Sequence, residues 1–169
     1  MMKNAYIGAI ENTVLGTVWF AFSRDGLAAV GVQESQASVR ERLERMGFNQ
    51  VVVDQDRLAM PLAQMNEYLN GTLRDFDIQI DWSVLTPFQQ KVLQATLAIP
   101  YGQTRTYAEI ARQVGKPRAA RAVGRAEATN PMPVVIPCHR VIGSDGKLHG
   151  YGAGEGLATK AWLLELEGR

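Results

Sequence analysis

Apolar residues gather in three short segments near the N-terminus, and turn residues separate them. The segments cover residues 5–11, 16–23 and 27–32, and each is rich in Val, Ile, Ala and aromatic side chains, which are typical of β-strands. Asp25 and Gly26 stand between the second and third segments, and this dipeptide favours a tight hairpin turn. The first part of the chain is therefore predicted to form a β-sheet.

Two helices are predicted in the same region. Charged residues surround Leu43 and Met46, which indicates a surface helix over residues 37–46 that Gly47 ends. A second helix is predicted over residues 58–69, because an Asn-Gly pair follows it. No catalytic constellation is visible in this half of the chain.

A further helix is predicted to begin after Thr86. Thr86 is a suitable N-cap, Pro87 fits the first turn, and Gln89 completes a capping box. This helix should run to about residue 98. We place a domain boundary just before it, so that residues 1–85 form one domain and residues 86–169 the other.

The same capping device recurs at Thr106 and Glu109 and predicts a short helix that Gly115 ends. Pro117 then begins another predicted helix, which runs to about residue 128. Two short helices separated by a tight turn, with arginines in the second, form a helix-turn-helix pattern. Such patterns occur in DNA-binding proteins and also as plain structural corners.

The predicted helix 117–128 has a basic face. Arg118, Arg121 and Arg125 are spaced by three and four residues and therefore share one side of the helix. Ala120 and Gly124 keep the helix thin, which suits close approach to a partner helix or to a DNA groove. An arginine stripe is also a common solvated face. The opposite face is expected to hold the small apolar residues Ala119, Ala122, Val123 and Ala126.

The net charge of +1 conceals an asymmetry between the two halves. Residues 1–85 hold 7 Lys plus Arg and 11 Asp plus Glu, whereas residues 86–169 hold 11 and 6. The second half is thus the basic one, and its arginine-rich helix favours nucleic acid as the partner.

The composition is that of a globular protein, with 46% hydrophobic and 21% charged residues. No stretch approaches the roughly 20 apolar residues of a membrane helix, and the N-terminus lacks a signal pattern. We therefore expect a cytoplasmic protein with no membrane partner. Cys138 is the only cysteine, and His139 and His149 are the only histidines. This excludes an internal disulfide and predicts no metal site.

The segment 130–141 carries the strongest chemical signal. It has three prolines within seven residues, and because proline fixes φ and lacks an amide donor, a rigid and mostly extended path is expected. Val134, Val135 and Ile136 should bury this path. The segment is therefore predicted to deliver Cys138 at the end of a stiff buried strand.

Cys138 is a candidate nucleophile. A lone cysteine is more often a small buried hydrophobe, but a thiol next to a base or a cation can ionise, and His139 and Arg140 supply both. Adjacent side chains rarely contact each other directly, so a water molecule is expected to relay the proton to His139. Glu165 and Glu167, in the predicted final helix, are the candidate carboxylates to hold the imidazole.

These motifs closely resemble the O6-alkylguanine-DNA alkyltransferases, also called methylated-DNA-protein-cysteine methyltransferases. The resemblance rests on residues 101–104, Tyr107, 118–124 and 130–141 and covers nearly all of 86–168; residues 1–85 match only in length and coarse strand pattern. It implies an α/β (α+β) fold. A small ribonuclease H-like sheet domain with helices would precede a mostly helical, winged helix-turn-helix-like domain that carries the active site.

The resemblance also implies a reaction. A damaged nucleotide in duplex DNA would be flipped out, and the alkyl (methyl) group on guanine O6 would pass irreversibly to Cys138 in a single turnover. No cofactor is implied. The expected partner is double-stranded DNA containing O6-alkylguanine, bound by a protein that is monomeric in solution and binds DNA either independently or cooperatively.

Each matching position inherits a role from the resemblance. Cys138 would be the alkyl acceptor, His139 the base acting through water, Glu167 the carboxylate that orients His139, and Asn130 the residue that braces the turn before the cysteine. The helix 117–128 would enter the minor groove.

Other matching positions would contact DNA or the flipped base. Arg121 would fill the gap left by the base, and Tyr107 would crowd the neighbouring phosphate and donate to the base. Tyr151 would stack on it or bind it, and the carbonyls of Cys138 and Val141 would accept from its amine. The remaining DNA-binding candidates are Ala120, Gly124, Arg118 and Arg125, and the remaining pocket candidates are Pro133 and Gly152.

The chain departs from the family pattern at residues 152–156, which form a loop about two residues longer than usual. This loop would shape the side of the pocket that receives the alkyl group. His149 matches no family role and is expected to be exposed.

Three other functions fit parts of the pattern. Alkyltransferase-like proteins recognise the same base without chemistry, but they have another residue at the cysteine position. A cysteine hydrolase would require better geometry than adjacent Cys138 and His139 provide. A transcription regulator would use the helix-turn-helix, but no sensor domain is visible.

Overall fold

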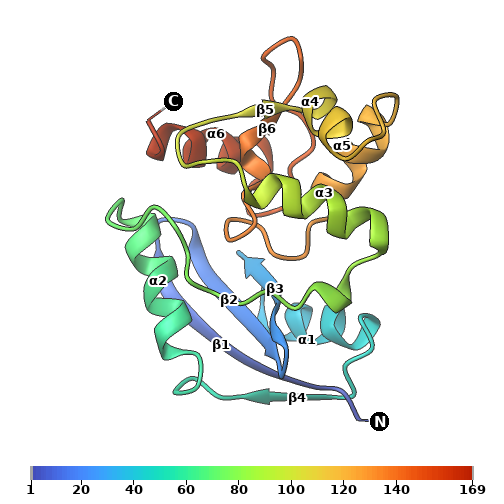
Figure 1. The fold of residues 1–169 in the computed structure, drawn as a ribbon. Helices are drawn as coiled ribbons and strands as arrows, with labels where there is room; N and C mark the ends of the chain where they lie inside the picture. Colours follow the sequence, from blue (N-terminus) through green and yellow to red (C-terminus); the bar gives the residue numbers. More distant parts are fainter. Residues whose placement is uncertain (1, 169) are drawn as a thin grey trace. The chain divides into compact units, whose positions relative to one another are not determined.

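The computed structural model describes residues 2–168 and is a mixed α+β structure (Figure 1). The chain divides between Val84 and Leu85 into two compact units, which we call the N-terminal and C-terminal units. The mixed α+β class predicted from the sequence is confirmed. No helix within residues 2–168 combines the length and the apolar character needed to cross a membrane.

The N-terminal unit is built on a four-stranded sheet with the order β3-β2-β1-β4. β1 (Asn4–Thr13), β2 (Gly16–Ser23) and β3 (Gly26–Val32) are antiparallel neighbours at the predicted places. β4 (Gln50–Val53) was not predicted, and it pairs in parallel with β1 at the sheet edge. The β2–β3 turn requires glycine at position 26, because φ is +139° and a Cβ there would lie 2.6 Å from the Gln79 carbonyl oxygen.

Two helices accompany this sheet, as predicted. They are α1 (Gln36–Arg45), which Ser35 caps, and α2 (Ala59–Leu69); the short 3-10 helix η1 (Trp82–Val84) ends the unit. Gly47 lies just beyond α1 with φ of +91°, the left-handed conformation that ends many helices. The core cluster beside α1 consists of Ala5, Ile7, Ala21, Ala28, Ala29, Val39, Leu43 and Phe48.

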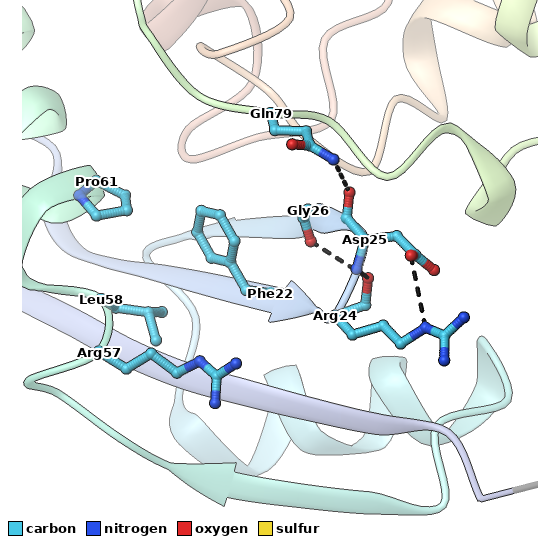
Figure 2. Close-up of a pocket in the computed structure, with 9 residues that line it drawn as sticks. Phe22, Arg24, Asp25, Gly26, Arg57, Leu58, Pro61 and Gln79 are labelled. Atoms are coloured by element: carbon cyan, nitrogen blue, oxygen red, sulfur yellow. Dashed lines mark hydrogen bonds and ion pairs between the residues drawn. The ribbon is translucent and has the colours of Figure 1, made fainter.

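A hollow of about 280 Å³ lies in the N-terminal unit, between the β2–β3 turn and the start of α2 (Figure 2). Phe22, Leu58 and Pro61 form its apolar wall. The exposed pair Arg24 and Asp25 stands at its edge, with 3.6 Å between Nε and Oδ1. The only cysteine and both histidines of the chain belong to the C-terminal unit, so the candidate site is built there.

Within residues 85–168, the C-terminal unit contains four α-helices. α3 (Pro87–Leu97) and α4 (Tyr107–Gln113) begin at the predicted capping boxes, in which Thr86 Oγ1 accepts from the Gln89 amide at 3.3 Å and Thr106 Oγ1 from the Glu109 amide at 3.1 Å. Both predicted caps are confirmed. The other two helices are α5 (Ala120–Ala128) and α6 (Leu157–Leu166).

The helix predicted over residues 117–128 is shorter than expected. α5 begins at Ala120, residues 117 and 118 form a turn and Ala119 is the N-cap, so Arg118 lies outside the helix. Ala122 is exposed beside Arg121, which corrects the prediction that it belongs to the buried face. At 100° per residue, positions 121, 122 and 125 share one side of a helix. The buried residues of α5 are Val123, Ala126 and Glu127.

A two-stranded parallel sheet ties distant segments of this unit together. β5 (Arg105–Thr106) precedes α4, and β6 (Val141–Ile142) follows the 3-10 helix η2 (Cys138–Arg140). The segment just before α4 is therefore hydrogen-bonded to the segment just after the cysteine.

Candidate active site

The segment before Cys138 is a compact turn, so the predicted extended strand is wrong. The Ile136 amide donates to the Met132 carbonyl at 2.9 Å, and Val134 has φ of +73°. Cys138 itself begins η2. Proline excludes helix interiors, but its fixed φ fits turns as well as extended backbone, and here the turn is formed.

Asn130 holds this turn from inside. Its Nδ2 donates to the Ile136 carbonyl at 3.0 Å, and its Oδ1 accepts from the Met132 amide at 2.9 Å. One side chain thus bonds both arms of the turn. A hydrogen bond from Asn130 also lowers the pKa of the Cys138 thiol. The same side-chain amide therefore fixes the turn and favours ionisation of the thiol.

The Cys138 thiol is buried, with 4% of the residue exposed. Burial, followed by the nearby charge of Glu127, raises its pKa to about 12, against the lowering effects of Asn130 and Lys160. The resting thiol is therefore protonated at neutral pH and needs a base. The charge of Lys160 lowers the pKa of the thiol, whereas the Arg140 guanidinium, which was predicted to supply the positive charge, is paired with Glu167.

Arg140 is engaged with Glu167. The guanidinium donates from Nε to Glu167 Oε2 at 2.9 Å and from Nη2 to Oε1 at 2.7 Å, and its Nη1 donates to the Ile99 carbonyl at 2.7 Å. Both side chains are buried. Glu167 also lies 2.9 Å from His139, between Oε1 and Nε2. Of the two candidate carboxylates, Glu167 is at the imidazole, and Glu165 is exposed.

This arrangement sets the protonation of His139. Glu167 accepts from the guanidinium through both oxygens and is therefore ionised, so the His139 Nε2 that faces it must be the donor. Burial lowers the pKa of His139 and keeps the ring neutral. Nδ1 then holds the lone pair of the neutral imidazole and is the basic nitrogen.

Lys160, which sequence reasoning missed, is buried to 1% exposure in α6. Its Nζ donates to the His149 carbonyl at 2.8 Å and to the Tyr107 hydroxyl at 3.2 Å, and the Tyr107 hydroxyl donates to the same carbonyl at 3.1 Å. Burial raises the pKa of Tyr107 to about 12 and lowers that of Lys160. The sequence gives no signal for this role, because it depends on the burial of Lys160 in α6.

A cleft of about 620 Å³ opens beside this network. It is formed by the start of α4, the outer face of α5 and the loop 143–150. Of the predicted residues, the structure brings four together there: Tyr107, Ala120, Arg121 and Gly124. Arg118 and Arg125 are exposed but do not line the cleft.

The predicted pocket residues lie mostly in the interior. Pro133, Val141 and Tyr151 are buried, whereas Gly152 is exposed, and none of them lines the cleft. The His149 side chain is exposed as expected, with Nε2 3.5 Å from Asp145 Oδ1. Within residues 2–168, no three His, Cys, Asp or Glu side chains are grouped as metal ligands would be.

The chain is similar to known proteins over most of its length. The family model for the 6-O-methylguanine DNA methyltransferase DNA-binding domain matches residues 87–169. A methylated-DNA–protein-cysteine methyltransferase of Mycobacterium bovis is 55% identical over 104 residues, which are 62% of this chain but only 61% of that protein. A protein of the same name from Methanosarcina acetivorans is 38% identical over 95% of this chain and 97% of its own length.

Solved structures agree with these sequence relatives. The crystal structure of Mycobacterium tuberculosis O6-methylguanine methyltransferase superimposes with a TM-score of 0.80 at 38% identity, covering 96% of this chain and 92% of that one. The structure of Mycobacterium tuberculosis OGT in complex with DNA gives a TM-score of 0.79, covering 97% and 92% of the two chains.

Proposed function

Since the chain belongs to the methylated-DNA–protein-cysteine methyltransferase family, we propose that it repairs DNA by moving an alkyl group from guanine O6 in duplex DNA to Cys138. The observation that carries the proposal is the side-chain set at η2. A single buried thiol precedes a neutral histidine, and a carboxylate fixes the tautomer of that histidine. This set provides a nucleophile and a base without any cofactor.

The proposed reaction is one displacement. The thiol proton passes through a water molecule to Nδ1 of His139, and Glu167 stabilises the imidazolium that forms. The thiolate attacks the alkyl carbon, the bond from that carbon to O6 breaks, and the released guanine takes up a proton. Lys160 lowers the pKa of the thiol and so favours the thiolate.

The product explains why we propose a single turnover. A thioether has no good leaving group, and no second thiol exists in the chain to remove the alkyl group. The protein would therefore be consumed as a reagent, one molecule for each repaired base.

Access to the base requires that it leave the helix. A stacked, paired guanine cannot reach a buried thiol, and flipping costs a few kcal/mol, less for a poorly paired base. We propose that α5 docks in the minor groove, that exposed Arg121 fills the gap, and that Tyr107 acts on the adjacent phosphate. Arg118, Arg125, Ala120 and Gly124 would support docking.

The flipped base would be held by groups near Cys138. We assign Tyr107 as a donor to the ring, Tyr151 as a stacking or hydrogen-bonding partner, and the carbonyls of Cys138 and Val141 as acceptors from the amine. Pro133 and Gly152 would complete the wall. The finer parts of this proposal are a ribonuclease H-like domain over residues 1–85, a winged helix-turn-helix-like domain over 86–169, and a monomeric protein that binds duplex DNA containing O6-alkylguanine.

The proposed function is tested by the intact mass of the protein after incubation with a short duplex containing one O6-methylguanine. We expect the mass of one methyl group on the peptide with Cys138, in one-to-one yield with restored guanine. An unchanged mass together with tight binding would instead indicate a recognition protein without chemistry.

Arg121→Ala is expected to slow transfer from duplex DNA roughly tenfold, since losing a side chain that stabilises the flipped state by about 1.4 kcal/mol has that effect. Transfer from the free O6-alkylated base should not change, because nothing is flipped. The measurement is the single-turnover rate of Arg121→Ala relative to the wild type, on duplex DNA and on the free base. Arg112→Ala, which alters an exposed arginine of α4 outside the cleft, is the matched control. Equal losses on both substrates would refute the flipping role.

A further inference from the structure

Glu127 is a buried carboxyl that the proposed reaction does not use. It lies on the buried side of α5, with Val123 and Ala126, and is only 3% exposed. No Lys, Arg or His nitrogen of residues 2–168 lies within ion-pair distance of it. An ionised carboxylate in such a place is costly unless it is paired. The position therefore favours the neutral form.

Thr96 gives an ionised Glu127 only weak support. Thr96 Oγ1 lies 3.0 Å from the Val92 carbonyl oxygen and is also hydrogen-bonded to Glu127 Oε1. A hydroxyl has one hydrogen, and a carbonyl can only accept. Thr96 therefore shares one hydrogen between the Val92 carbonyl and Glu127, so an ionised Glu127 receives less than one full hydrogen bond from it.

The second carboxyl oxygen of Glu127 also lies in surroundings that favour the protonated form. Glu127 Oε2 is buried and has no hydrogen-bond partner among residues 2–168. Leaving a charged oxygen without donors costs more than leaving a neutral one. Both oxygens of Glu127 are thus in surroundings that suit a carboxylic acid.

Three other titratable groups face Glu127. They are Lys160 from α6, Cys138 from η2 and Tyr107 from α4. Burial raises the pKa of Glu127 to about 8, while Thr96 and Lys160 act to lower it. An ionised Glu127 in turn raises the pKa of the Cys138 thiol. The carboxylate and the thiolate therefore compete for the single cation, Lys160.

We propose that Glu127 is a positioning residue that carries a proton in the active protein, and that its neutral form leaves the Lys160 ammonium to stabilise the Cys138 thiolate. The inference rests on the proposed function, because it assumes that the thiolate is the reactive species. The inference predicts a pH dependence of the reaction rate that is unusual for a thiol. Alkaline pH, which normally increases thiolate reactivity, would here ionise Glu127 and slow the reaction.

The test is the single-turnover rate of alkylation by free O6-benzylguanine between about pH 6 and pH 10, which avoids any effect of pH on DNA binding. The wild-type rate should rise and then fall above about pH 8. In Glu127→Gln the fall should disappear, so that the ratio of the rate at about pH 9.5 to the rate at about pH 7.5 increases roughly tenfold or more. Glu165→Gln, at an exposed glutamate of α6, should keep the wild-type ratio.

A second variant and a spectroscopic readout make the test independent of how well Glu127→Gln folds. Thr96→Val removes a bond that lowers the pKa of Glu127 and should move the alkaline fall to higher pH. The infrared spectrum of the wild type should contain a protonated-carboxyl band that disappears as the rate falls. Absence of the band at neutral pH, or an alkaline fall that neither variant alters, would overturn the inference. A wild type that is not alkylated at any pH would instead refute the proposed function.

Discussion

Cys138→Ala is expected to abolish alkyl transfer and to leave the affinity for duplex DNA nearly unchanged. The chain has no other thiol, so no second acceptor of similar nucleophilicity can replace it. The cysteine lies in the buried η2 and does not line the cleft beside Arg121, so the DNA-facing surface should be preserved. Transfer is followed by the mass of the protein, and the dissociation constant by titration of a labelled duplex containing O6-methylguanine.

The buried position of Cys138 requires a control for folding. Removing the sulfur from a packed interior leaves a small cavity and costs about 1 kcal/mol, which thermal unfolding of the variant would report. Cys138→Ser keeps a similar volume and should also be inactive, because an alcohol is a much weaker nucleophile than a thiolate. Transfer by either variant would show that another residue accepts the alkyl group.

Glu167→Ala is expected to lower the free energy of unfolding by roughly 3–5 kcal/mol, because it leaves the buried guanidinium of Arg140 without its carboxylate. It should also slow transfer strongly, since His139 loses the partner that fixes its tautomer. Urea denaturation measures the first effect and single-turnover kinetics the second.

Two comparisons separate these effects. Glu165→Ala removes an exposed glutamate two positions away and should change stability by no more than about 0.5 kcal/mol. Glu167→Gln keeps the size and one acceptor oxygen, so it should retain more stability than Glu167→Ala while still slowing transfer. Similar stability in Glu165→Ala and Glu167→Ala would contradict the buried pair.

Local chemistry explains which parts of the fold could be predicted. The capping boxes at Thr86 and Thr106 and the hairpin beside Asp25 depend on residues within three positions of each other, and all three are present. The hairpin turn is formed one residue earlier than predicted, by Arg24 and Asp25, and Gly26 begins β3. β4 could not be recognised in the same way. It is four residues long, and its partner β1 lies some 46 positions earlier; the only signal was the short valine run at 51–53.

In the candidate site too, features set by neighbouring residues could be predicted and features set by distant packing could not. The Cys138-His139-Arg140 motif and Glu167 were visible as residue types in a pattern, although their roles stay predictions. The path of the chain before Cys138 was not visible, because proline restricts φ without choosing between a turn and a strand. Lys160 and Glu127 were missed because their importance comes from burial, which depends on how α5 and α6 pack and not on their neighbours in sequence.

The triangle of Tyr107, Lys160 and the His149 carbonyl has a thermodynamic consequence. The Tyr107 hydroxyl donates its only hydrogen to that carbonyl, so a base that accepts from Tyr107 exchanges one hydrogen bond for another. Exchanges of this kind contribute little net affinity, since a bond is lost for each bond formed. They still discriminate, because a base without a suitable acceptor would break the internal bond without replacing it. In the proposed base pocket, Lys160 would keep the displaced carbonyl bonded during the exchange, which would lower the cost of admitting the correct base and leave the penalty for a wrong one.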